Sequence, residues 1–125
     1  MGRIELTAEK FAELFGGKPV VDEGDDPEFM RILQRFIFGE VFYTGDLDDQ
    51  TRELITVSVL TANQTLPQLT VHVRAALAAG CTPVEIREAV YQCAPLIGFP
   101  KTLNAISAMN EAFRGKGIAL PLPAQ

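Results

Sequence analysis

Apolar residues recur at helical spacing along most of the chain, and no segment alternates apolar and polar residues for long enough to predict a strand. A short first helix is predicted to begin after Thr7 and to end at Gly16-Gly17, and residues 18–25 are expected to form a loop. The Asp26-Pro27 pair then starts a second helix. Its expected core-facing stripe consists of Phe29, Ile32, Leu33, Phe36, Ile37 and Val41. The pattern therefore predicts an all-α fold.

Four further helices are predicted between residues 48 and 117. The predicted starts are a cap at Asp48 or Asp49, a helix start near Pro67 and the capping box 82–85. The predicted ends are a turn near Asn63 and Gln64, Gly80, Pro95 and Gly115. The expected core residues of the fourth and last helices are Leu69, Val73, Ala76, Leu77, Leu103, Ile106, Met109 and Phe113. We expect a single-domain bundle of about six helices, with an N-terminal helix and loop over 1–25, the helical domain over 26–117 and an extended tail over 118–125.

The third predicted helix is apolar on nearly every side, because its sequence includes Leu54, Ile55, Val57, Val59 and Leu60. Such a helix has to be buried on several faces. A monomer of about six helices provides too few neighbours for this, whereas a contact between subunits would cover the remaining face. We therefore expect a homo-oligomer.

Composition and charge limit the partners of the protein. The 125 residues include 16 acidic and 11 basic side chains, which give a net charge of −5. No basic run suits a nucleic acid or an anionic membrane surface, so neither partner is expected. No apolar run is long enough to span a bilayer. The N-terminus lacks the apolar core of a signal peptide, which predicts a cytoplasmic location.

The cysteines and the histidine are few. Cys81 and Cys93 do not form a disulfide framework and are expected to be reduced thiols. The single histidine, His72, has no cluster of cysteine or acidic residues in the sequence around it, so no metal is expected. A set of Glu53, His72 and Glu40 is the only candidate metal site in the sequence.

The most informative pair of residues is Glu53 and His72. They lie in the third and fourth predicted helices, about ten and nine residues from the turn that joins them, so antiparallel helices would place them at nearly the same height. A carboxylate beside an imidazole is the minimum arrangement for moving a proton at neutral pH. Thr65 and Gln68 share the helix face of His72, and Glu40 falls within the apolar stripe of the second helix. We regard these last three as candidate substrate-binding residues.

Each of these residues also has a plainer interpretation. A lone histidine on a helix is often a hydrogen-bonded structural residue, and an acid near a helix start, such as Glu53, often faces solvent and the helix dipole. Glu40 is alternatively expected to lie at the end of its helix and to reach water.

Four segments together resemble a known family, namely 38–41 (FGEV), 51–55 (TRELI), 72–77 (HVRAAL) and 97–100 (IGFP). In this order and spacing they are similar to the carboxymuconolactone decarboxylase family, whose wider superfamily includes the alkyl hydroperoxidase D proteins. The resemblance extends from about Phe29 to Phe113. It implies an alkyl hydroperoxidase D-like helical fold, assembled into homotrimers or hexamers.

The resemblance also implies an activity, which is decarboxylation of a small-molecule substrate without a cofactor. In the namesake reaction 4-carboxymuconolactone loses CO2, and a proton then has to be delivered to carbon. His72 as an imidazolium would be that general acid, held in orientation by Glu53. Gln68 would donate a hydrogen bond to the lactone carbonyl.

One departure from the superfamily concerns redox chemistry. In its redox branch a Cys-x-x-Cys pair precedes the histidine, with the second cysteine four residues before it. The corresponding residues here are Thr65 and Gln68. A thiol peroxidase needs a thiolate to attack the peroxide and a second thiol to resolve the product, and neither residue supplies one.

Three classes of function remain open at this point. The first is a cofactor-free lyase, or a related proton-transfer enzyme, acting on a small unsaturated acid or lactone. The second is a peroxiredoxin-like or alkyl hydroperoxidase-like antioxidant enzyme, which would have to use Cys81 or Cys93. The third is a non-catalytic, small-ligand-binding oligomer that uses the same pocket.

Overall fold

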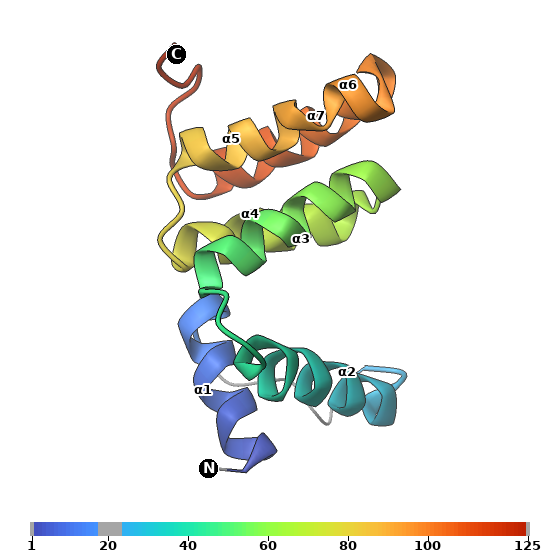
Figure 1. Cartoon of the computed structure of the whole chain (residues 1–125), viewed down its shortest axis with the longest axis vertical. Coiled ribbons are helices and arrows are strands. Elements are labelled where there is room, and N and C mark those ends of the chain that lie inside the picture. The colour runs from blue at the N-terminus through green and yellow to red at the C-terminus, as the bar shows by residue number, and fades with distance from the viewer. Residues whose placement is uncertain (1, 18–23, 125) are drawn as a thin grey trace. The chain divides into compact units, whose positions relative to one another are not determined.

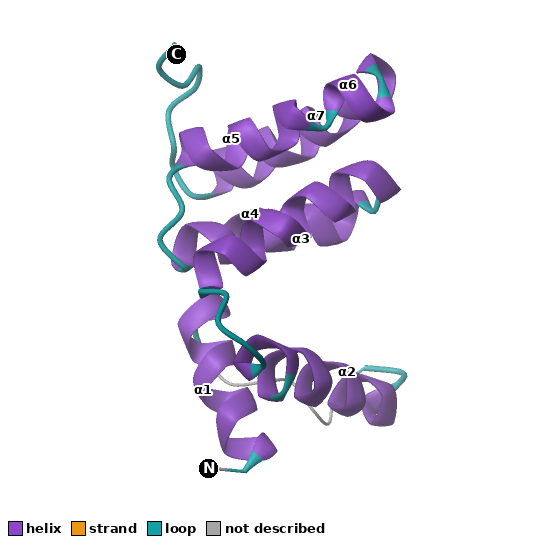
Figure 2. Ribbon diagram, in the orientation of Figure 1, coloured by secondary structure: helices purple, strands orange, loops and turns teal. Residues whose placement is uncertain are grey.

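The computed structural model describes residues 2–17 and 24–124, and the chain divides into two compact units. The N-terminal unit is Met1–Leu47 and the C-terminal unit is Asp48–Gln125. Helices are the only regular elements among the described residues, so the all-α prediction is confirmed (Figure 2). Six helices are of ten residues or more, as the sequence led us to expect. No helix of the described residues is both long enough and apolar enough to cross a membrane.

The N-terminal unit consists of α1 (Arg3–Phe15), α2 (Pro27–Gly39) and the 3-10 turn η1 (Val41–Tyr43). Helix α1 begins before the start predicted after Thr7. The hydroxyl of Thr7 donates to the carbonyl of Arg3 one turn earlier, so this residue lies within the helix rather than capping it. Gly16, with a φ of 69°, ends α1 at the predicted position. The loop predicted over 18–25 lies almost wholly outside the described residues.

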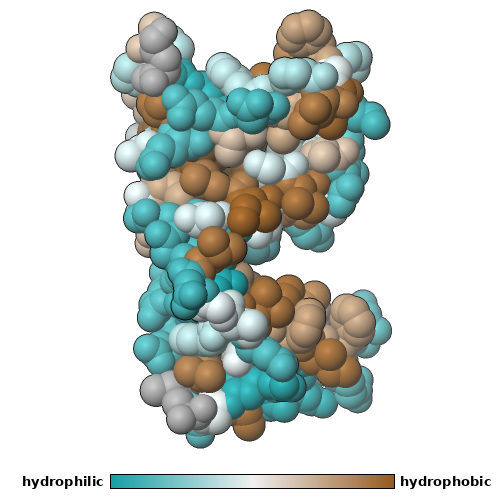
Figure 3. Space-filling model, in the orientation of Figure 1, coloured by the Kyte–Doolittle hydropathy of each residue, from teal (hydrophilic) through white to brown (hydrophobic). Residues whose placement is uncertain are grey.

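The core-facing stripe predicted for α2 is wrong at most of its positions, and only Leu33 and Ile37 are partly buried. Phe29, Ile32 and Phe36 are 62%, 64% and 56% exposed, and Figure 3 shows apolar surface over this helix. The buried side of α2 instead carries Phe38, whose ring packs edge-on against those of Phe11 and Phe15 of α1 at 5.9 and 5.3 Å. Helix α2 has apolar residues on two faces, and periodicity cannot indicate which of the two meets a neighbouring helix.

A glycine allows α1 and α2 to approach closely. A Cβ atom at Gly39 would lie 2.7 Å from the carbonyl oxygen of Arg3 and would overlap the hydroxyl oxygen of Thr7. Only glycine fits such a contact between backbone segments. Gly39 belongs to the 38–41 segment, so part of that segment's pattern has a packing explanation.

The C-terminal unit contains α3 (Asp49–Asn63), α4 (Leu66–Ala78), α5 (Pro83–Gln92), the single turn α6 (Ala94–Ile97) and α7 (Phe99–Gly115) (Figure 1). Most boundary predictions are confirmed. Asp48 caps α3 by accepting a 2.8 Å hydrogen bond from the amide of Thr51. Thr82 and Glu85 form both bonds of the predicted capping box of α5.

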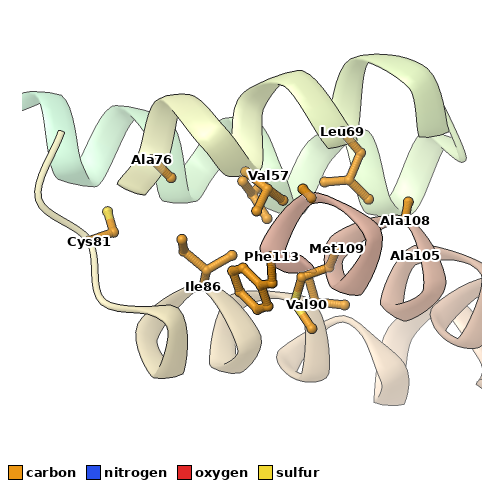
Figure 4. Close-up of a cluster of buried hydrophobic side chains, with 12 residues drawn as sticks. Val57, Leu69, Ala76, Cys81, Ile86, Val90, Ala105, Ala108, Met109 and Phe113 are labelled. Carbon is orange, nitrogen blue, oxygen red and sulfur yellow. The ribbon is translucent and has the colours of Figure 1, made fainter. Parts of the chain in front are cut away.

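The core of this unit lies among α3, α4, α5 and α7. Figure 4 shows Ile86 of α5 close to Phe113 of α7, and Leu69 of α4 close to Ala108 of α7, with Val57 of α3 in the same cluster. The stripe predicted for α4 is largely confirmed, but Leu103 of α7 is exposed. Helix α7 instead turns small residues inward, which lets it lie close against α4: Thr102, Ala105, Ala108 and Ala112.

Within the C-terminal unit, the other helices cover only one side of α3. Val57 is completely buried, whereas Ile55 and Val59 are about half exposed, at 49% and 50%. This exposed apolar face agrees with the reasoning that led to an expected subunit contact. The homo-oligomer itself stays a prediction.

We predict that Gly39→Ala lowers the free energy of unfolding by about 1–3 kcal/mol, because the added methyl group overpacks the contact between α1 and α2. Chemical denaturation of the full chain followed by circular dichroism measures the change. Gly115→Ala is the matched control, since nothing lies within 4 Å of a Cβ atom there. A Gly39→Ala protein as stable as the Gly115→Ala protein would contradict the steric explanation.

Candidate functional site

Glu53 and His72 are hydrogen-bonded to each other, as their predicted common height required. Nδ1 of His72 lies 2.8 Å from Oε1 and 3.1 Å from Oε2 of Glu53. Glu53 comes from the first turns of α3, and His72 comes from the middle of α4, which packs beside α3. The surface-acid interpretation of Glu53 is therefore wrong.

The burial of this pair determines what it can do. The side chain of Glu53 is 0% exposed and that of His72 is 17% exposed. A buried carboxylate is costly unless it is paired and hydrogen-bonded. An ionised carboxylate can only accept hydrogen bonds, so Nδ1 of His72 has to carry the proton that it donates to Glu53. This contact orients the imidazole ring through Nδ1.

The connection between α3 and α4 holds the pair in register. Gln64 adopts a left-handed conformation, with φ 58° and ψ 33°, which ends α3 and lets the chain reverse. Its side-chain amide donates to the carbonyls of Thr61 and Lys101 at 2.8 Å, and its oxygen accepts from Asn104 at 3.0 Å. The turn is thereby attached to the start of α7 as well as to α3.

The other predicted site residues lie at various positions on their own helices. Gln68 is exposed in the first turn of α4, and Thr65 is half-buried at its N-cap position. Glu40 lies in the N-terminal unit, exposed at the end of α2, where its carboxylate pairs with Arg3. That position matches the plainer interpretation of Glu40, in which it reaches water at a helix end.

Two small residues, Ala75 and Ala79, follow His72 along α4 and its C-cap. Ala75 is completely buried, so its small side chain is packed against neighbours rather than leaving room. Two cavities of the C-terminal unit are lined by α5, α7 and residues that adjoin them, and His72 lines neither of these two. Among the described residues, no group of three His, Cys, Asp or Glu side chains is arranged to hold a metal ion.

One buried polar residue of α3 was not identified from the sequence. Thr61 is completely buried on the face of α3 that also carries Glu53 and Val57, and its hydroxyl has no hydrogen-bond partner among the described residues. Its spacing of eight residues from Glu53 places it two turns further along that face. The signal was available in the sequence, but a threonine in an apolar helix is easily counted as a packing residue.

The two cysteines are separate, buried thiols. Sγ of Cys81 donates to the carbonyl of Gln50, and Sγ of Cys93 donates to the carbonyl of Ala89 one turn earlier. Burial, with a contribution from nearby Glu85, raises the pKa of the Cys81 thiol from 9.0 to about 11. Burial also raises the pKa of Cys93. Both thiols are therefore poor sources of the thiolate that a peroxidase requires.

Comparison with known proteins identifies the family. Residues 27–111 match the carboxymuconolactone decarboxylase family, and the chain belongs to this family. The match contains Glu53, His72 and all four segments whose resemblance was noted in the sequence.

Three curated relatives are similar to the chain. A 4-carboxymuconolactone decarboxylase of Acinetobacter baylyi is 30% identical over 93% of this chain and 87% of its own. A nitrosuccinic acid decarboxylase of Metarhizium robertsii is 31% identical over 60% of this chain and 52% of its own. An uncharacterised 15.0 kDa protein of Paracoccus denitrificans is 37% identical over 61% and 58%. These relatives support a decarboxylase-like role.

We predict that His72→Ala lowers the free energy of unfolding by about 3–5 kcal/mol, because it leaves the buried carboxylate of Glu53 without its partner. Adding Glu53→Leu removes that charge and should recover part of the loss, so the two changes are strongly non-additive. Urea denaturation at neutral pH measures both effects. Glu111→Ala, on the surface of α7, is the control and should change stability by less than about 0.5 kcal/mol. Additive effects of the two substitutions would show that the pair is not coupled.

The raised pKa of Cys81 predicts a pH dependence with a definite sign. The folded protein holds the thiol proton more tightly than the unfolded chain, so this stabilisation is complete below pH 9.0 and is lost as the pH rises toward about 11. Stability should therefore fall between these values in the wild type and fall less steeply in Cys81→Ala. Denaturation curves at several alkaline pH values test this, and parallel declines would contradict it.

Proposed function

We propose that this protein is a cofactor-independent decarboxylase of a small unsaturated carboxylic acid or carboxy-lactone, with proton transfer by His72 and Glu53. The observation that carries the proposal is the hydrogen bond from Nδ1 of His72 to the buried carboxylate of Glu53. Support also comes from the family and from two relatives that are named as decarboxylases. 4-Carboxymuconolactone is the first substrate to test.

The proposed reaction has two steps that balance in atoms and charge. The bond between the substrate carbon and its carboxylate breaks, CO2 leaves, and the electron pair is delocalised into the unsaturated lactone. Nε2–H of the His72 imidazolium then delivers its proton to carbon, and the ring becomes neutral. Solvent returns the proton to Nε2 and completes the cycle.

Glu53 has two roles in this proposal. Its carboxylate stabilises the imidazolium that forms before each turnover, and it keeps the ring in the orientation that directs Nε2 away from α3. Gln68 lies one turn before His72 on α4 and is exposed, so its amide is available to donate to a substrate carbonyl. Thr65 and Glu40 stay candidates for substrate binding.

We also propose that the protein works as a homo-oligomer, a trimer or hexamer. The exposed apolar residues of α2 and of α3 support this, because clustered apolar side chains on a surface are typical of protein–protein contacts. A subunit contact would remove Phe29, Ile32 and Phe36 from water. Cytoplasmic location and action in the breakdown of aromatic compounds complete the proposal.

The enzymatic proposal predicts ultraviolet-detected turnover of 4-carboxymuconolactone by the wild type. His72→Gln should lower kcat by about 10²–10⁴-fold, because the amide still donates to Glu53 but cannot transfer a proton. Glu53→Gln should cause a smaller loss, since it keeps an acceptor but removes the charge. Glu88→Gln, an exposed acid on α5, is the control and should retain full activity.

Two outcomes would overturn parts of this account. Full turnover by a folded His72→Gln protein would remove the acid role. No turnover by the folded wild type on this lactone or on nitrosuccinate, together with saturable binding of either, would favour a non-catalytic binding protein.

For the assembly, light scattering at micromolar concentration should give a mass of at least three chains. Phe36→Asp should lower that mass, because it places a charge in the apolar contact, whereas Glu28→Gln on the same helix should not. A monomeric wild type would contradict the proposal.

A further inference from the structure

We propose that a groove along α5 and α7, distant in the chain from Glu53 and His72, binds an amphiphilic carboxylate: an acidic headgroup at one end and an aliphatic body along the rest. This α5–α7 groove consists of two adjoining cavities. One is lined by Arg87, Asn110 and Arg114 together with the tail, and the other is lined by Ala94, Phe99 and Leu103. The proposal does not depend on the decarboxylase function.

The polar end of the groove is built to receive an anion. Its cavity has a volume of about 420 Å³, and Arg87, Asn110 and Arg114 all line it. In the part of the chain that the structure describes, neither arginine forms an ion pair with a carboxylate. Two such cations in a protein with a net charge of −5 form a local site of opposite sign.

Arg87 is already held in position. Its Nη2 donates to the carbonyl of Pro123 in the C-terminal tail at 2.9 Å, and its guanidinium lies 5.7 Å from the centre of the Tyr91 ring. These contacts reduce the freedom of a long side chain before any ligand arrives. The tail carbonyl uses only part of the guanidinium, whose other N–H groups can donate to a carboxylate.

The other end of the groove is apolar. Its cavity, of about 340 Å³, is lined mainly by carbon atoms of Ala94, Phe99 and Leu103. Phe99 and Leu103 are 75% and 59% exposed, although they lie on a helix whose opposite face is core. Leaving such side chains in water is unfavourable, and an aliphatic chain laid on them would remove that cost.

The two cavities are joined by shared walls. Tyr91 and Ile106 line both of them, and they lie between the polar and apolar ends on α5 and on α7. Along α7 the groove runs from Phe99 to Arg114, which at 1.5 Å rise per residue is about 22 Å. This length and this polarity fit an extended aliphatic carboxylate better than a compact polar metabolite, which would leave the apolar end empty.

A direct test uses decanoate and, as a neutral counterpart, 1-decanol. The chain has two tyrosines and no tryptophan, so in a Tyr43→Phe background the emission of Tyr91 reports on the groove alone. Saturable binding of decanoate is expected, with a change in Tyr91 emission. Isothermal titration measures its affinity independently.

Substitutions separate the two ends of the groove. Arg87→Gln and Arg114→Gln should each weaken decanoate binding about tenfold and leave 1-decanol within about twofold. Leu103→Ser should weaken both ligands. Lys101→Gln removes a charge from α7 at a residue that does not line the groove, and it should change neither affinity by more than about twofold.

Three results would overturn the proposal. The first is no decanoate binding by folded protein, and the second is binding that the arginine substitutions leave unchanged. The third is a groove covered by a second copy of the chain. In that case Leu103→Ser would lower the mass seen by light scattering, and wild-type protein would bind no decanoate. Loss of decarboxylase activity in His72→Gln bears on none of these outcomes, so the two proposals fail separately.

Discussion

The candidate site depends on one constraint, which is that a carboxylate with no exposure to solvent has to be paired. Glu53 is completely buried between α3 and its neighbours, and His72 supplies the donor that makes this burial tolerable. The same contact orients the imidazole ring through its Nδ1 atom. Packing and chemistry are therefore not separable here, because the interaction that lets α3 and α4 come together also orients the imidazole.

Much of the fold could be predicted because local signals determine helix ends. A capping side chain, a proline at the first turn or a residue at positive φ acts within a few residues, as at Asp48, Thr82 and Gln64. The packed face of α2 could not be predicted in this way. The exposed face is the more regularly apolar one, whereas the buried face includes Gln34. The buried face is the one that contacts α1, through Phe11, Phe15 and the close approach at Gly39.

In the candidate site, likewise, only the pairing that local geometry determines could be predicted. Two antiparallel helices with one short turn leave little freedom in which residues face each other, so the spacing of Glu53 and His72 was sufficient to bring them together. The sequence did not predict the positions of candidate site residues that lack such a constraint. Glu40 lies in a different unit, where Arg3 pairs with it, and no local pattern encodes a contact so far away in the chain. The unpartnered hydroxyl of Thr61 likewise depends on what the folded helices enclose.

The most direct test of the central interaction is long-range ¹H–¹⁵N correlation spectroscopy of the imidazole. His72 is the only histidine, so its two ring nitrogens give the only such signals in the spectrum. At a pH where the ring is neutral, the account predicts the tautomer with the proton on Nδ1 in the wild type, and loss of that preference in Glu53→Ala. The proton on Nε2 in the wild type, or a preference that survives Glu53→Ala, would contradict it.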